Sequence, residues 1–247
     1  MGKQLLGSLE LNRIYQMDCL EGLKMLPDNS VNLAIIDPPY SGLVNKSKQG
    51  SGGRMSNGHI AFDDMSERAF QMFFTQRLYE IYRVLEMGSH IYVYTDWKQL
   101  RNMMDCVELS SFKLLNLITW DKQNMGLGSG YRQQSEYVIV ASKGLHNSFN
   151  LKNVSNVLKQ KRVHRGEHQH QKPIELSDIY IENSTKENDI ILVPFVGSGS
   201  ECVSAVNKGR NFIGFELESK YIELANKRLE VIQVDDDLLQ QINTGEF

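Results

Sequence analysis

The chain has 247 residues, of which 41% are hydrophobic and 23% are charged, and its formal net charge is −3. This composition is typical of a soluble globular protein, and one domain spanning residues 1–247 is the simplest organisation for that length. The three cysteines form no CxxC pair, the longest apolar run is five residues, and the N-terminus lacks the apolar stretch of a signal peptide. We therefore expect a cytoplasmic protein that does not cross a membrane.

Short apolar runs alternate with stretches of helical periodicity along the chain. The runs predict strands at 31–36, 90–95, 113–120, 135–141, 190–193 and 212–215. The periodic stretches predict helices at 66–85, 97–109, 173–182, 200–208 and 219–231. Ser66 is a plausible N-cap and Gly88 a plausible stop for the first helix, and residues 234–247 are expected to fray. This alternation predicts an α/β fold with a mainly parallel sheet and helices on both faces.

Two segments interrupt this alternation. Residues 42–58 hold five glycines and three serines, which predicts a mobile loop. The window 143–172 holds seven Lys or Arg against one acidic residue, together with four of the six histidines. It is either a solvated loop or a patch that contacts phosphates, and composition alone leaves both open. His164, His168 and His170 fit no common four-ligand set, so we expect no metal.

The first candidate site is the glycine-rich segment Pro194–Ser200, which follows a predicted strand and opens a helix. Two glycines allow a tight turn that approaches a ligand, and the helix N-terminus offers free N–H groups. Glu216, at the end of the next strand, stands where α/β nucleotide sites bind a ribose. The pattern predicts a site for a cofactor that contains adenosine.

The second candidate site is Asp37-Pro38-Pro39-Tyr40, directly after the strand at 31–36. Two prolines stiffen the backbone, so the Asp37 carboxylate and the neighbouring carbonyls are held at the carboxyl edge of the sheet. Rigid acceptors suit an exocyclic amino group, and Tyr40 offers a face on which a flipped base can stack. A simple Asp-Pro turn is the alternative for this motif taken alone, but it does not explain the accompanying glycine loop.

With these two sites in place, the chain resembles the amino-methylating DNA methyltransferases, in the subgroup where DPPY precedes the cofactor motif. The matching pieces, in the order of that subgroup, are MDCLEGLKMLPDNSVNLAIIDPPY, YRVLEMGSHIYVY, LITWDK, QSEYVIVASKG, QKPIEL, FVGSGS and NFIGFELESKYIELANKRL. The resemblance implies a Rossmann-like fold with a seven-stranded sheet in circularly permuted order. It also implies S-adenosylmethionine as the methyl donor and DNA with a flipped base as the acceptor. DPPY favours N6 of adenine, and N4 of cytosine is the near alternative.

The resemblance also implies roles for matching residues. Asp37 and the Pro38 carbonyl would bind the adenine amino group, beside Pro39, and Tyr40 would stack on the base. Glu216 would hold the cofactor ribose, Lys172 its carboxylate, and Asp18 with Cys19 its adenine. Residues that would wrap the rest of the cofactor are Phe195, Gly197, Ser198, Gly199 and Ser200, and Asp37 also borders it.

Segments 41–62 and 144–171 are the candidate target-recognition region. Their candidate DNA-binding residues are Lys46, Lys48, Arg54, Lys159, Lys161, Arg162 and Arg165. Members of the family often form dimers, so a homodimer is a candidate assembly.

The chain departs from the family pattern at Val193, where an Asp usually lies near the methionine end of the cofactor. This departure keeps open a second hypothesis, a catalytically impaired DNA-binding or regulatory subunit with weakened cofactor binding. A dinucleotide oxidoreductase is disfavoured, because Cys202 stands where that fingerprint has its third glycine and because DPPY would be unexplained.

Overall fold

A computed structural model of the protein describes residues 4–39, 66–163 and 171–244. Its main sheet has eight strands in the order β3-β10-β9-β4-β5-β7-β6-β8. Their bounds are β3 (Arg13–Gln16), β4 (Val31–Ile36), β5 (Leu85–Thr95), β6 (Phe112–Asp121), β7 (Ser135–Lys143), β8 (Val157–Lys159), β9 (Ile190–Val193) and β10 (Asn211–Glu216). Strand β7 runs antiparallel to both neighbours, and all other adjacent pairs are parallel. The predicted fold class is confirmed, with an eighth strand because the short β8 extends the edge of the sheet.

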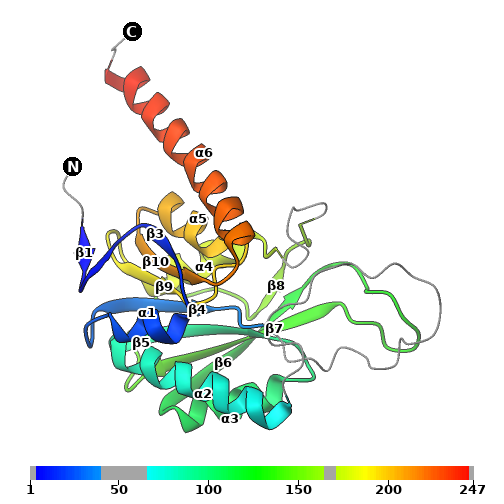
Figure 1. The fold of residues 1–247 in the computed structure, drawn as a ribbon. Helices are drawn as coiled ribbons and strands as arrows, with labels where there is room; N and C mark the ends of the chain where they lie inside the picture. Colours follow the sequence, from blue (N-terminus) through cyan, green and yellow to red (C-terminus); the bar gives the residue numbers. More distant parts are fainter. Residues whose placement is uncertain (1–3, 40–65, 164–170, 245–247) are drawn as a thin grey trace.

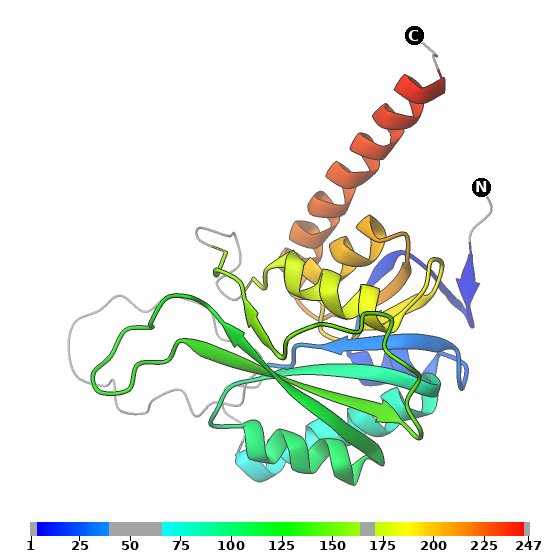
Figure 2. The same ribbon diagram turned by 180° about the vertical axis from the view of Figure 1, so that it is seen from behind.

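Helices cover both faces of the sheet, as Figure 1 and the reverse view in Figure 2 show. Their bounds are α1 (Cys19–Lys24), α2 (Glu67–Val84), α3 (Leu100–Leu109), α4 (Ile174–Ser184), α5 (Ser200–Asn207) and α6 (Ser219–Thr244). Side chains of α1, α2 and α3 join one hydrophobic cluster, and side chains of α4, α5 and α6 join the other. The sheet is therefore the middle of three layers.

Strand β4 lies at the centre of the sheet, between β9 and β5. Ala34 and Ile36 pack into the cluster on the α2 face, whereas Leu33 and Ile35 pack into the cluster on the α4 face. Burial on both faces favours apolar residues along the strand, which explains the apolar run that predicted it; the partly exposed Asn32 is its one polar position. Asp37, the residue after β4, is consequently attached to a strand that is packed on both faces.

Several elements differ from the sequence prediction. Helix α2 ends at Val84 and passes directly into β5, so Gly88 lies within the strand region instead of stopping the helix. Gly88 has a φ of +85°, and a Cβ there would lie 2.5 Å from the Asn147 side chain, which accounts for the glycine. Helix α6 continues to Thr244, beyond the predicted end, and extends away from the sheet (Figure 1). The sequence analysis did not predict α1, β3, β8 or the small antiparallel pair β1 (Leu5–Leu6) and β2 (Leu9–Glu10).

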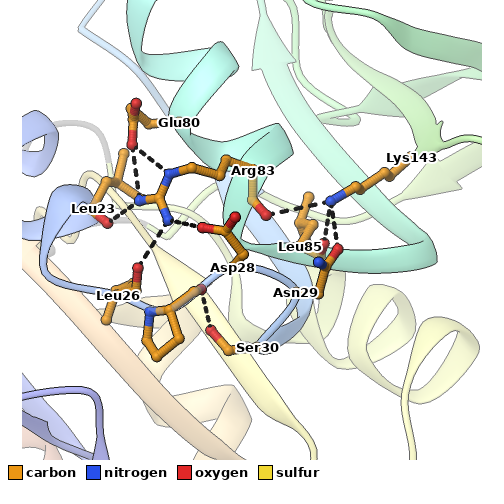
Figure 3. Close-up of polar contacts among 10 residues, drawn as sticks. Leu23, Leu26, Asp28, Asn29, Ser30, Glu80, Arg83, Leu85 and Lys143 are labelled. Carbon is orange, nitrogen blue, oxygen red and sulfur yellow. Dashed lines mark hydrogen bonds and ion pairs between the residues drawn. The ribbon is translucent and has the colours of Figure 1, made fainter.

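A polar cluster ties α2 to the segment that precedes β4 (Figure 3). Arg83 donates to the carbonyls of Leu23 and Leu26 and pairs with Asp28 and Glu80. Beside it, the Nζ of Lys143 donates to Asn29 Oδ1 at 2.8 Å and to the Leu85 carbonyl at 2.7 Å. Lys143 is buried, so this member of the basic window stabilises the fold and is not part of a basic surface.

Candidate active site

The two predicted motifs meet at the carboxyl edge of the sheet. Strands β4 and β9 are parallel neighbours, so Asp37 and the loop after Val193 leave the sheet side by side. Helix α2, the first helix after β4 among the described residues, packs on one face, whereas α5, which follows β9, packs on the other. A point where successive connections turn to opposite faces opens a crevice at the carboxyl ends of the strands, which is where α/β proteins bind ligands.

The glycine loop between β9 and α5 has the geometry of a ligand cradle. Gly197 and Gly199 have φ angles of +50° and +78°, and a Cβ on Gly199 would lie 2.6 Å from the Ala225 side chain. Phe195 is half-buried, while Ser198 and Ser200 are buried against α6, where Arg228 bonds the Ser198 carbonyl. The loop therefore keeps a compact shape that only glycine permits at position 199.

Glu216, at the end of β10, fixes this loop. Its Oε2 accepts a hydrogen bond from the N–H of Gly197 at 2.8 Å, and its Oε1 accepts from the N–H groups of Leu217 and Glu218 at 2.8 and 3.0 Å. The carboxylate thus lies beside the glycine loop, where the sequence predicts the ribose-binding acid. Carboxylate oxygens accept more than one hydrogen bond, so these contacts leave capacity for the hydroxyls of a ribose.

Asp18 and Cys19 lie next to Glu216, because the N–H of Met17 donates to the Glu216 carbonyl at 3.1 Å. The Asp18 side chain caps α1 through the N–H of Leu20, and both of its oxygens accept from Nη2 of Arg77, at 2.9 and 2.6 Å. The Cys19 side chain is buried, which raises the pKa of its thiol to about 12. The structure thus gives Asp18 a capping and ion-pairing role, and its predicted contact with the cofactor adenine stays a prediction.

Lys172 connects the two motifs. Its Nζ lies 3.1 Å from Oδ2 of Asp37 and 3.4 Å from Oε2 of Glu136, and only 5% of its side chain is exposed. Its carbonyl accepts a hydrogen bond from Oγ of Ser200 at 2.8 Å. The backbone of Lys172 therefore binds the start of α5, while its ammonium group holds Asp37. A contact with the cofactor carboxylate stays a prediction.

Glu136 carries this network toward the predicted DNA side. Its Oε1 lies 3.1 Å from Nζ of Lys122 and 3.9 Å from Nη2 of Arg162. Burial raises the pKa of the Glu136 carboxyl, but the ammonium groups of Lys172 and Lys122 outweigh this effect and hold that pKa below its usual range. Sequence reasoning missed this residue, and its position opposite Trp120 in the β6–β7 ladder is what places it beside Lys122.

A second acidic residue that sequence reasoning missed is Glu201, in the first turn of α5. It is 4% exposed, and its Oε1 has no hydrogen-bond partner among the described residues. Burial, together with the nearby Asp37 carboxylate, raises the pKa of this carboxyl to about 7, although its own backbone N–H, Lys172 and Arg228 act in the opposite direction. Its place directly after the glycine loop was the only signal in the sequence.

Comparison with known proteins identifies the family. A family model described as DNA methylase, N6_N4_Mtase, matches residues 31–227, which include both motifs. The chain belongs to this family. Its methylases take the methyl group from S-adenosylmethionine, and the residues present fit that donor: a carboxylate at the ribose position, a glycine cradle that a Cβ would fill, and a buried carboxyl with an open oxygen.

Individual relatives agree with this assignment. The methylase is 31% identical to the Type II methyltransferase M.HhaII of Haemophilus parahaemolyticus over 215 residues, covering 84% of this chain and 91% of that one. It is 32% identical to M2.LlaDCHI of Lactococcus lactis subsp. cremoris, covering 87% and 88%. Among solved structures, it superposes on the M1.HpyAVI–SAM complex with a TM-score of 0.67 at 23% identity, covering 88% and 98%. It also superposes on the cytosine-N4-specific PvuII DNA methyltransferase with a TM-score of 0.71 at 16% identity, covering 87% and 85%. These structures support the fold.

The candidate DNA-binding residues of the methylase are only partly described. Lys159 ends β8, and Lys161 and Arg162 follow it, with Arg162 bound to Glu136 as above. Tyr40, Lys46, Lys48, Arg54, Arg165 and the three histidines at 164, 168 and 170 lie outside the described residues, as does the segment 41–62. In the described part of the methylase, no helix combines the length and apolar character needed to cross a bilayer.

Proposed function

We propose that this methylase transfers a methyl group from S-adenosylmethionine to N6 of adenine in DNA, with the target base flipped out of the helix. The observation that supports this proposal is the adjacency of the Asp37-Pro38 segment and the glycine loop on neighbouring parallel strands. One motif binds an amino group and the other binds an adenosine cofactor, so their proximity is what transfer between the two requires.

In this proposal the chain works by positioning and electrostatics. The cofactor supplies a methyl group on a cationic sulfur. The Asp37 carboxylate and the Pro38 carbonyl accept hydrogen bonds from the exocyclic N–H groups, which orients the nitrogen and draws electron density toward it. Lys172 fixes the Asp37 carboxylate through the 3.1 Å contact, and no covalent intermediate with the enzyme is needed. Tyr40 stacks on the base, as the resemblance implies.

The recognition elements belong to the proposal as well. Segments 41–62 and 144–171 contact DNA, with the basic side chains named in the sequence analysis on the phosphates. The relatives' description as Type II methyltransferases supports methylation within a defined DNA sequence as part of restriction–modification. We further propose a single catalytic domain, whose assembly as a homodimer is a prediction from the resemblance.

The test is methyl transfer from radiolabelled S-adenosylmethionine to unmethylated DNA, followed by nucleoside analysis of the product. We expect label in N6-methyladenine, and we expect Asp37→Ala to lower the rate by roughly 100- to 1000-fold because the main acceptor for the amino group is lost. Asp105→Ala, which removes an exposed carboxylate on α3, is the matched control and should leave the rate unchanged.

Other outcomes overturn parts of the proposal. Label in N4-methylcytosine would keep the mechanism and refute the choice of base. DNA binding without any transfer of label would refute the activity and support the impaired regulatory subunit that Val193 keeps open.

A further inference from the structure

Glu201 is a buried carboxyl, and one of its two oxygens, Oε1, finds no hydrogen-bond partner in the described chain. Only 4% of the residue is exposed. An unpaired polar atom in the interior is costly, and nearly all such atoms in folded proteins have a partner. A carboxyl held in this state beside a ligand cradle is therefore expected to find its partner in the ligand.

The position of Glu201 favours a contact with the amino-acid end of S-adenosylmethionine, the methyl donor. It directly follows Ser200, whose Oγ donates to the Lys172 carbonyl and accepts from Arg228. The charge that acts on it most strongly is that of Asp37, at the predicted reaction centre. Glu216, the acid at the predicted ribose position, lies at the end of β10, which neighbours β9 on the side away from β4. Glu201 is thus on the reaction-centre side of the glycine loop.

The other acids around the loop already have partners. Asp37 is paired with Lys172, and Glu216 accepts three backbone N–H groups. Val193, the last residue of β9, is buried and apolar, so it offers no charge on this side. Oε2 of Glu136 also lacks a hydrogen bond, but it is paired with Lys172, so Glu201 is the described acid at the loop whose open oxygen lacks an ion pair as well.

We propose that Glu201 binds the α-ammonium group of S-adenosylmethionine. The ammonium donates to Oε1 of Glu201, and the ion pair replaces the missing partner of the buried carboxyl. This assignment rests on the family's methyl donor and not on which base is methylated.

Binding of an ammonium group requires the ionised form of Glu201. In the free protein this carboxyl is balanced between its neutral and ionised forms near neutral pH, since burial raises its pKa to about 7. A bound cation stabilises the ionised form, so binding releases part of a proton and affinity rises as the pH increases toward 8. Several other titratable groups face Glu201. They are Asp37 after β4, Tyr94 from β5, Lys172 before α4, Tyr180 from α4, the adjacent Cys202 and Arg228 from α6.

The experiment is calorimetric titration of the full chain with two probes. S-adenosylhomocysteine carries the ammonium group, whereas 5′-methylthioadenosine has the same adenosine but lacks the amino-acid end. Glu201→Gln should weaken the affinity for S-adenosylhomocysteine roughly 10- to 100-fold and leave the affinity for 5′-methylthioadenosine within twofold of the wild-type value. The same variant should also abolish the rise in S-adenosylhomocysteine affinity between about pH 6 and about pH 8. Glu175→Gln, an exposed acid in the first turn of α4, is the matched control and should change neither affinity.

Two results would overturn the assignment. One is S-adenosylhomocysteine affinity within twofold of wild type in Glu201→Gln. The other is an equal loss of affinity for both probes, which would show that Glu201 stabilises the loop and does not bind the ammonium group. Neither bears on the methyl donor itself, because binding of S-adenosylhomocysteine to the wild-type chain tests that separately.

Discussion

At the scale of single residues, Glu216 at the end of β10 and Glu201 at the start of α5 are two acids beside the same glycine loop, with different tasks. Glu216 gathers three N–H groups and so shapes the cradle itself, whereas Glu201 leaves an oxygen open. Glu216→Ala should therefore weaken the affinities for S-adenosylhomocysteine and 5′-methylthioadenosine alike, by roughly 10- to 100-fold, since both ligands carry the ribose. Calorimetric titration of both probes measures this effect.

The control for this change is Glu218→Ala. Its carboxylate pairs with Lys220 rather than with the glycine loop, so both affinities should stay at the wild-type value. Undiminished binding of 5′-methylthioadenosine to Glu216→Ala would show that the ribose is held elsewhere.

Asp37 and Glu216 could be predicted from sequence, because Asp37 follows an apolar strand, Glu216 ends one, and parallel strands place such ends at one edge of the sheet. Glu136 and Glu201 could not. Their burial depends on which strands and helices pack together, and the local sequence around each resembles that of many exposed acids. Lys172 was predicted as a site residue, but its pairing with Asp37 and Glu136 depends on β4, β7 and the start of α4 converging.

At the scale of secondary-structure elements, Lys172 pairs with two acids from different strands, Asp37 after β4 and Glu136 in β7. Without this cation the two carboxylates would lie near each other uncompensated. Lys172→Met removes the cation that fixes Asp37 and also the charge that most strongly lowers the pKa of the Glu136 carboxyl. Methyl transfer near neutral pH should fall roughly 10- to 100-fold, with the acidic limb of the rate–pH profile moving to higher pH. Initial rates across the pH range measure both effects.

A matched control is Lys208→Met, since Lys208 likewise bridges two carboxylates, Asp178 and Glu182, but between α4 and α5. Its rate–pH profile should be unchanged. Lys172→Met could instead lose affinity for S-adenosylhomocysteine while the acidic limb of its rate–pH profile stays in place. That result would show that Lys172 binds the cofactor carboxylate, as the family resemblance implies, and that its ion pair with Asp37 is secondary.

Prediction succeeded for strands with a strong apolar pattern in the interior of the sheet and failed for the weakly patterned strands at its edges. The strand at 31–36 and the strand at 190–193 have the predicted bounds, because burial on both faces favours apolar residues at nearly every position. Strands β3 and β8 are four and three residues long and lie at the edges of the sheet, where one neighbour suffices and little apolar pattern is needed. Helix α1 depends on the Asp18 cap and on Arg77, a residue from a distant helix.

At the scale of the whole molecule, the buried acid of α5 gives stability a dependence on pH. The pKa of Glu201 is about 7 in the folded protein against an ordinary value of 4.5, so the folded state binds the proton more tightly. Its contribution to the free energy of unfolding is complete below pH 4.5 and is lost as the pH rises through 7. Glu201→Gln lacks this loss, so its stability relative to wild type should increase by about 3 kcal/mol between about pH 5 and about pH 8.

Urea unfolding of both proteins at several pH values checks this expectation. Burial and the nearby His146 lower the pKa of His90 to about 4, so its contribution is lost as the pH falls, but it is common to both proteins and cancels in the difference. A difference in unfolding free energy that stays constant with pH would show that the Glu201 carboxyl is already paired in the free protein.

The central pairing of β4 with β9 also determines when the methylase can become active during folding. The bond from the N–H of Ile190 to Oδ1 of Asn32 joins residues 158 positions apart, and β9 separates β4 from every strand on that side of the sheet. Closing so long a stretch of chain is entropically expensive and makes folding slow. Until β9 arrives, one side of β4 has no neighbour and Asp37 has no glycine loop beside it. A growing polypeptide therefore cannot modify DNA with its first half alone, and catalytic competence appears together with completion of the sheet.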